Sequence, residues 1–324
     1  MSDIDQPADG PSGSTSGKQR RDAAREKARL ARQKQKRRQR TGRWALQGGL
    51  ALVAVGVVVA VVLVITSSVR PAGPGPENMA SDGIKIGADL QVVPTGALGP
   101  DEEPVPSETT ATSDTVDIVV YLDYLCPICG QFEAANNAYI EGLVSSGAAT
   151  IEYHPVAILT NQSAGTRYSN RAANAAACVA NYSPNSFFDV NAALFEAQPV
   201  EGTRGLDDGQ LKDLVTGVEG LQQSSRVEDC IDDEQFASWV TAATQRAVSE
   251  PLPNSDLQGL QGTPTVLVDG QRYDYSTPFT QQEFSNFVVA ASSTSYSESG
   301  TETPAPGETT APEATPAPEE TPAS

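Results

Sequence analysis

Residues 116–129 read VDIVVYLDYLCPIC, and this stretch decides the fold. Its first seven residues, Val116 to Leu122, are mostly β-branched or aromatic, which predicts a short buried strand. After Cys129, apolar residues recur at the spacing of one helical face: Phe132, Ala135, Tyr139 and Leu143. The two cysteines of the Cys-Pro-Ile-Cys motif are therefore expected where a strand turns into the start of a helix.

This position favours thiol chemistry. Unpaired backbone N–H groups and the helix dipole stabilise an anion at a helix N-terminus, so we expect a stabilised Cys126 thiolate. We expect Cys126 to be the exposed nucleophile and Cys129, one turn further on, to be the buried resolving thiol. Pro127 suits the first helical turn, where its missing N–H costs nothing.

Two other interpretations of the Cys-Pro-Ile-Cys motif are weaker. Half of a zinc site would need a second cysteine pair or a pair of histidines, but the chain has one histidine, and Cys178 and Cys230 lie 52 residues apart. A purely structural disulfide across a two-residue loop would gain little entropy. We therefore expect a redox pair that needs no metal and no cofactor.

A charge asymmetry divides the chain around a long apolar run. Residues 1–43 carry 13 Lys/Arg and 5 Asp/Glu, whereas the remaining 281 residues carry 9 and 36. Leu46 to Ile65 contains no charge and is long enough to cross a bilayer core of about 30 Å. By the positive-inside rule the basic side is cytoplasmic. The sequence thus predicts a largely disordered cytoplasmic segment over 1–43 and one transmembrane helix over 44–66, which places the protein in the cell membrane.

Two alternatives for this region are disfavoured. A cleaved signal peptide would have a shorter apolar run, a shorter preceding segment and an A-x-A-like cleavage site. The basic run could bind nucleic acid, but membrane topology and anionic lipid headgroups already explain it. The acidic remainder also argues against a nucleic-acid partner. An even count of four cysteines fits an extracytoplasmic location, where disulfides persist.

Composition predicts the remaining domain boundaries. Residues 67–114 are rich in Pro, Gly, Ser and Thr and are expected to form an extracytoplasmic linker, with a possible edge strand near 83–87. Residues 115–291 form the folded domain, in which a helical segment is inserted at about 165–250. Residues 292–324 repeat Thr-Pro patterns and are expected to be a disordered acidic tail.

The folded domain is expected to be of the α/β class. Its predicted elements are a strand at 116–123, a helix at 127–145, a strand at 149–155, helices across 168–250, strands at 264–269 and 271–276, and a helix at 280–291. Asp269-Gly270 is a strong two-residue hairpin signal between the last two strands. The first helix is long enough to be the crossover between two parallel strands.

This order and the active-site sequence resemble the thioredoxin fold in its DsbA-like form, in which a helical domain is inserted between two half-motifs. The resemblance is carried by residues 121–129 (YLDYLCPIC) with Phe132-Glu133, and by Gly262-Thr263-Pro264-Thr265. It covers about 200 of the 324 residues. With the predicted anchor and the acidic tail, the layout is similar to that of membrane-anchored DsbA-like proteins of actinobacteria.

The resemblance implies roles for residues outside the cysteine pair. Pro264 would be cis and would face the active-site disulfide, while the backbone of Thr263 would pair with a substrate strand; a trans proline that begins a strand is the alternative. Asp123 could hydrogen-bond near the site or relay a proton, but it could equally be a capping carboxylate. Glu133 could raise a thiol pKa, although a solvated helix face is favoured. His154 is expected to be a packed polar residue.

Cys178 and Cys230 fall in two helical segments of the insert. Pairing them would close a loop of about 50 residues, worth roughly 4 kcal/mol in the chain-entropy model. Four cysteines allow three connectivities. Pairing of Cys126 with Cys129 and of Cys178 with Cys230 is favoured on chemical grounds, while a regulatory or resolving role for the second pair is the alternative.

The sequence therefore predicts a thiol–disulfide oxidoreductase that passes its disulfide to unfolded, cysteine-containing secreted proteins. The resemblance implies a membrane oxidase that restores the disulfide. An isomerase or reductase of the same fold is one alternative: the Pro127-Ile128 dipeptide lacks the hydrogen-bonding histidine of the strongest oxidants, and Thr263 resembles the residue found in isomerases and reductases. A redox-inactive binding module is the other.

Overall fold

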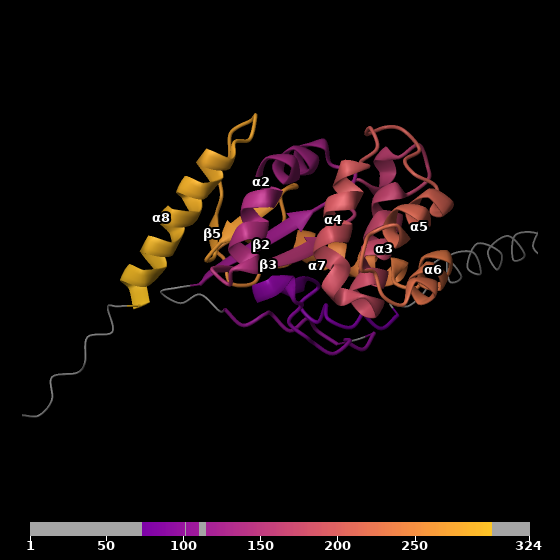
Figure 1. Cartoon of the computed structure of the whole chain (residues 1–324), viewed down its shortest axis with the longest axis horizontal. Coiled ribbons are helices and arrows are strands. Elements are labelled where there is room, and N and C mark those ends of the chain that lie inside the picture. The colour runs from indigo at the N-terminus through magenta and orange to yellow at the C-terminus, as the bar shows by residue number, and fades with distance from the viewer. Residues whose placement is uncertain (1–72, 101, 110–114, 300–324) are drawn as a thin grey trace, which may run out of the picture. The chain divides into compact units, whose positions relative to one another are not determined.

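The computed structural model describes residues 73–100, 102–109 and 115–299, which are shown in Figure 1. Within these residues one mixed sheet has the strand order β1-β3-β2-β4-β5. The strands are β1 (Ile84–Ile86), β2 (Val116–Leu122), β3 (Ala149–Pro155), β4 (Thr265–Val268) and β5 (Gln271–Arg272). β2 and β3 are parallel, and every other neighbouring pair is antiparallel.

Helix α2 (Pro127–Ser145) is the crossover that makes the parallel pairing of β2 and β3 possible. The helix and β3 begin and end where the sequence predicts. Ile118 pairs with Ile151, and Val120 pairs with Tyr153 on β3 and with Val266 on β4. All five side chains are fully buried in the main core, so the centre of the sheet lies at the centre of the domain.

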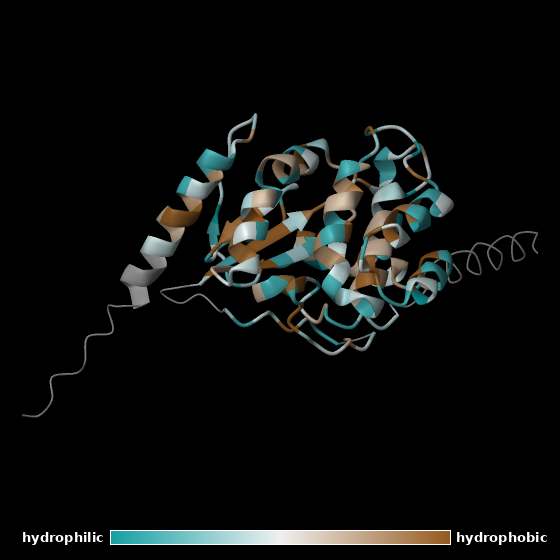
Figure 2. Ribbon diagram, viewed as in Figure 1, coloured by the Kyte–Doolittle hydropathy of each residue, from teal (hydrophilic) through white to brown (hydrophobic). Residues whose placement is uncertain are grey.

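The insert follows β3 and precedes β4. Its helices are α3 (Tyr168–Tyr182), α4 (Phe187–Glu196), α5 (Asp208–Thr216), α6 (Ser224–Asp232) and α7 (Ala237–Ser249), with 3-10 turns η2 (Thr160–Gln162) and η3 (Pro184–Ser186). Nearly all of the alanine-rich α3 is buried, because the other helices pack around it. Figure 2 shows apolar residues concentrated in the strands and polar residues on the outer helix faces. The predicted order of strands, helical insert and final hairpin is confirmed.

The C-terminal elements differ in length from the prediction. Asp269 and Gly270 form the predicted hairpin turn with positive φ angles of 48° and 78°. Strand β5 ends at Arg272 rather than at 276, and the Tyr273 ring after it packs on Phe284 of α8. Helix α8 (Gln281–Ser299) runs past the predicted end at 291, since the next proline is Pro304. The first residues of the expected disordered tail are therefore helical.

The described part of the expected linker is folded onto the domain. Met79, Ile84 and Ile86 are fully buried in the main core, and β1 pairs with β3. A 3-10 turn, η1 (Ala88–Leu90), follows β1. The carboxylate of Asp82 accepts two hydrogen bonds from the Arg246 guanidinium on α7, at 2.6 and 2.7 Å. This segment therefore has the buried contacts of a domain element, which a linker lacks.

Some predictions fall outside the described residues: the basic segment at 1–43, the membrane span at 44–66 and the tail from residue 300. In the part of the chain that the structure describes, no helix has both the length and the apolar character needed to cross a membrane.

Candidate active site

The dithiol lies at the junction of β2 and α2. Cys126 is the N-cap of α2, with Pro127 at the first helical position, and its Sγ accepts a hydrogen bond from the Cys129 N–H at 3.4 Å. Both cysteines are free thiols. Only 6% of the Cys126 surface and 1% of the Cys129 surface are exposed. Cys126 is therefore more buried than the exposed nucleophile that the sequence predicts. Cys126 is still the more accessible of the two thiols.

The environment separates the two thiols in acidity. The hydrogen bond with the Cys129 thiol is the largest cause that lowers the pKa of Cys126 from 9.0 to about 6, while burial opposes this shift. The Thr263 side chain and the N–H groups of Cys129 and Ile128 lower it further. Burial first, and then the neighbouring Cys126, raise the pKa of Cys129 well above its usual range. At neutral pH the thiolate is therefore on Cys126.

The turn before β4 brings the second half of the fold to the dithiol. The peptide bond between Thr263 and Pro264 is cis. When protonated, the Cys126 thiol donates a hydrogen bond to the Thr263 carbonyl at 3.2 Å, although 137 residues separate the two in sequence. The structure thus brings Cys126, Cys129 and Thr263-Pro264 into one site.

Asp123 organises the turn between β2 and the dithiol. It is fully buried. Its two carboxylate oxygens accept hydrogen bonds from the backbone N–H groups of Leu125 at 2.8 Å and Leu159 at 2.9 Å. Burial raises the pKa of Asp123, and these hydrogen bonds oppose the rise. The contacts are those of a carboxylate at the end of β2 that binds the backbone of two loops, whereas the N-cap of α2 is Cys126.

Glu133 does not lie on a solvated helix face, contrary to the expectation. Only 3% of its surface is exposed, because α4 covers this side of α2. Neither carboxylate oxygen has a hydrogen-bond partner among the described residues. Burial raises the pKa of Glu133 to about 7, and the nearby Asn191 side chain opposes the rise. Glu133 follows Cys129 by one helical turn, so a buried acid lies below the dithiol.

Comparison with known families identifies the fold. The family model described as Thioredoxin matches residues 111–289. The chain belongs to the thioredoxin family. Its architecture is the thioredoxin fold with a helical segment inserted between the two halves, as the DsbA-like form predicts.

Solved structures similar to this thioredoxin-family chain are described as disulfide oxidoreductases. The disulfide bond oxidoreductase DsbG of Mycobacterium tuberculosis is 30% identical, with a TM-score of 0.43, over 57% of this chain and 85% of that chain. DsbA of the same organism is 26% identical, with a TM-score of 0.46, over 67% of this chain and 98% of that chain. MdbA of Actinomyces oris, a thiol-disulfide oxidoreductase, is 19% identical, with a TM-score of 0.46, over 65% of this chain and 89% of that chain. Comparison with curated proteins gave no match.

The second cysteine pair of this thioredoxin-family chain forms a disulfide. Cys178 on α3 and Cys230 on α6 are bonded, with their Cα atoms 5.9 Å apart. Both side chains are buried inside the insert. The bond therefore joins two helices of the insert.

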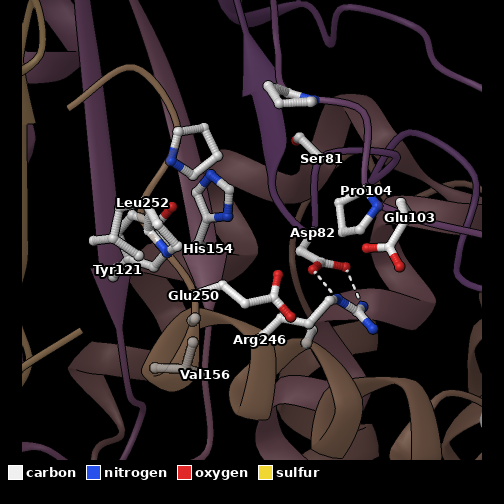
Figure 3. Close-up of a pocket in the computed structure, with 15 residues that line it drawn as sticks. Ser81, Asp82, Glu103, Pro104, Tyr121, His154, Val156, Arg246, Glu250 and Leu252 are labelled. Atoms are coloured by element: carbon white, nitrogen blue, oxygen red, sulfur yellow. Dashed lines mark hydrogen bonds and ion pairs between the residues drawn. The ribbon is translucent and has the colours of Figure 1, made fainter. Parts of the chain in front are cut away.

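His154 lies on the other face of the sheet from α2. It stacks on Tyr121, with ring centroids 4.3 Å apart, and its Nε2 is 3.3 Å from Glu152. Successive strand residues point to opposite faces, so Tyr121 points away from the side on which Val120 packs. These two rings line a cavity of about 200 Å³ between α7 and the N-terminal segment. Figure 3 shows them in this cavity, which contains no dithiol residue.

Sequence reasoning missed the contribution of the insert to the site. Gln198, in the loop after α4, donates hydrogen bonds from Nε2 to the carbonyls of Tyr124 and Cys126. Asn191 and Phe195 of α4 also contact the Tyr124 side chain. No local motif marks these residues, since a glutamine in a loop has no distinctive spacing. The only sequence signal is a glycine at 130 in the first turns of a helix.

Proposed function

We propose that the protein is an extracytoplasmic, membrane-tethered disulfide oxidase that introduces disulfides into secreted proteins through Cys126 and Cys129. The chain is a thiol–disulfide oxidoreductase of the DsbA type; the proposal concerns the direction of exchange, its location and its partners. The observation that carries it is the N-capping contact of Cys126, where hydrogen bonds lower the thiol pKa to about 6. A stabilised thiolate favours the reduced form of the pair, which makes the oxidised form a better oxidant.

The same acidity difference supports both steps of the exchange. A substrate thiolate attacks Sγ of Cys126, the bond between the two enzyme sulfurs breaks, and Cys129 leaves and takes up a proton. The high pKa of Cys129 favours that protonation. A second substrate thiol then loses its proton and attacks the substrate sulfur of the mixed disulfide. Cys126 leaves as a stable thiolate, since thiols of low pKa leave faster.

In total, two electrons pass from two substrate thiols to the enzyme disulfide. The substrate gains a disulfide and the enzyme becomes the dithiol. We expect the Thr263 backbone to hold the substrate strand beside the sulfur, because its carbonyl lies 3.2 Å from Cys126 Sγ. A membrane oxidase would then restore the Cys126–Cys129 disulfide. The predicted span at 44–66 would hold the enzyme in the lipid bilayer, where secreted chains emerge.

The test is the oxidation of a reduced, unfolded protein by the full-length oxidised enzyme in detergent. We expect one substrate disulfide per enzyme, and no oxidation by Cys126→Ser or Cys129→Ala, which have no active-site disulfide to transfer. Incubated instead with the disulfide-bonded form of the substrate, Cys129→Ala should accumulate mixed disulfides on a non-reducing gel, because its Cys126 thiolate attacks the substrate disulfide and expels one substrate thiol. Cys129→Ala accumulates them because no second enzyme thiol can expel the bound substrate. An enzyme that reduces disulfides or rearranges scrambled ones, but does not oxidise dithiols, would establish the isomerase or reductase alternative. A dithiol that never exchanges would establish the binding module.

A further inference from the structure

One face of α4 contacts the residue two positions before the nucleophile. The Tyr124 hydroxyl donates to Asn191 Oδ1 at 3.0 Å, and the Tyr124 ring lies 5.1 Å from the Phe195 ring. Gln198 then donates from Nε2 to the carbonyl of Tyr124 at 3.1 Å and to that of Cys126 at 2.9 Å. Asn191 and Phe195 lie four residues apart on one face of α4, and Gln198 follows in the loop after the helix. A segment 72 residues away in sequence is thereby fixed to the active-site turn.

Gly130 is a second, independent sign that the Gln198 side chain occupies a defined place. A Cβ atom added at Gly130 would clash with Oε1 of Gln198. Glycine weakens a helix interior relative to alanine, so its presence in α2 needs a reason. Gly142, in the same helix, has open space where its Cβ would lie. Of the two glycines in α2, Gly130 leaves room that a neighbouring side chain fills and Gly142 does not.

We propose that Gln198 is a positioning residue for Cys126: its amide holds the turn from Tyr124 to Cys126, and Gly130 leaves the space it needs. The proposal deepens the disulfide-exchange function, on which it rests for the identity of the reacting thiol. Both hydrogen bonds that the Gln198 amide donates go to backbone carbonyls of the turn, so we expect it to act on the sulfur through the turn. The insert thus takes part in the chemistry of the dithiol through one side chain.

The expected effect follows from the contacts of the sulfur. The Cys129 N–H lies 3.4 Å from Cys126 Sγ, and this contact depends on the course of the turn. Without the two hydrogen bonds of Gln198, the turn relaxes and the thiolate loses part of its N–H stabilisation. We therefore expect the pKa of Cys126 to rise by about half a unit to one unit, which means roughly three- to tenfold less thiolate below the pKa.

The experiment measures alkylation of Cys126 by iodoacetamide between pH 4 and 9. The full-length protein in detergent is reduced mildly, so that the buried Cys178–Cys230 disulfide stays closed, and the labelled peptide is identified by mass spectrometry. Gln198→Met keeps the side-chain length without the donors, and Gly130→Ala displaces the amide. Gly142→Ala is the matched control on the same helix.

We expect Gln198→Met and Gly130→Ala each to slow alkylation at pH 5 by roughly three- to tenfold, and Gly142→Ala to leave the profile unchanged. The double variant Gln198→Met/Gly130→Ala should be no slower than the slower single variant, because both changes remove one contact. Additive effects in the double variant would overturn the proposal. A Gln198→Met variant that melts at a lower temperature but keeps the wild-type pH profile of alkylation would also overturn it, since Gln198 would then only stabilise the fold.

This readout does not depend on the oxidase activity. If the wild-type enzyme failed to oxidise a reduced protein, the proposed function would be refuted, while the alkylation profiles would still decide the role of Gln198. If the profiles were unchanged and the oxidase activity of the wild type were normal, only the role of Gln198 would be refuted.

Discussion

Replacing Glu133 with glutamine should stabilise the protein by an amount that grows as the pH rises above 4.5 and levels off above about 7. The Glu133 carboxyl is buried between α2 and α4, and neither oxygen has a partner among the described residues. Its charge also raises the pKa of the fully buried Tyr124 and Tyr153, although burial is the larger cause for both. A buried carboxylate without partners disfavours the folded state, whereas a neutral amide of the same shape does not.

The magnitude follows from the pKa shift. Burial raises the pKa of Glu133 from 4.5 to about 7. Between these pH values the folded protein holds a proton that the unfolded chain has released, so the free energy of unfolding falls as the pH rises. The contribution is fully present below pH 4.5 and is lost as the pH rises through 7. At ~1.4 kcal/mol per pH unit, the loss amounts to about 3 kcal/mol.

The assay is urea unfolding of the full-length protein in non-ionic detergent at intervals between pH 4 and pH 8. Fluorescence of Trp239, which is buried on α7, reports the unfolding of the domain. The difference in unfolding free energy between Glu133→Gln and the wild type should grow by about 3 kcal/mol across this range. The exposed Glu141 on the same helix gives the matched control, Glu141→Gln, for which the difference should stay flat.

A difference that stays constant with pH would refute the reasoning, because it would mean that Glu133 titrates alike in the folded and unfolded states. A difference that shrinks as the pH rises would also refute it, since the carboxylate would then be stabilised by the fold. An equal slope for Glu141→Gln would assign the effect to the net charge of the protein.

Three further predictions concern the thiols and the membrane span. The alkylation rate of Cys126 should have its midpoint near pH 6, below the ordinary thiol value, because the start of α2 stabilises the thiolate; a normal midpoint, or faster alkylation of Cys129, would contradict this. Replacing Cys178 and Cys230 with serine should lower the free energy of unfolding by roughly 4 kcal/mol and leave exchange at Cys126 nearly intact; unchanged stability with lost oxidase activity would make this pair a redox relay. Protease added to intact cells should remove the catalytic domain and leave the segment before 44–66 protected; release of a mature protein that begins near residue 70 would contradict it.

The elements flanking the dithiol could be predicted because local signals agree there. Cys126 as N-cap and Pro127 at the first turn both mark the start of α2, and Asp269-Gly270 marks the hairpin. The packing of the N-terminal segment could not be predicted. Its short apolar stretches stand among Pro and Gly residues, and the partner of Asp82 is Arg246, 164 residues away. Composition alone predicted a linker here, because the contacts that hold this segment on the domain are with residues remote in sequence.

The buried face of α2 was predicted only in part. The apolar pattern pointed to Phe132, which is buried, and to Ala135, Tyr139 and Leu143, which are half-buried against the core. The buried set is Cys129, Phe132, Glu133, Asn136, Ile140 and Val144. Helix α2 packs against β3, α4 and α8, so its buried face is wider than the stripe that an amphipathic surface helix shows. Polar residues within that wider face have no sequence signature, because their burial depends on the insert.

The two glycines of α2 mark the limit of what the sequence can say about this site. Both stand inside a helix, where alanine is intrinsically more favourable, and although only Gly130 follows a cysteine, the sequence does not show that the space beside the two glycines differs. The difference appears only when α4 is in place, because its C-terminal loop brings Gln198 against one glycine and leaves the other open. A residue that acts through tertiary packing therefore becomes visible only in the fold. For this reason the matched pair of alanine substitutions is a more direct test of the site than any change to the cysteines themselves.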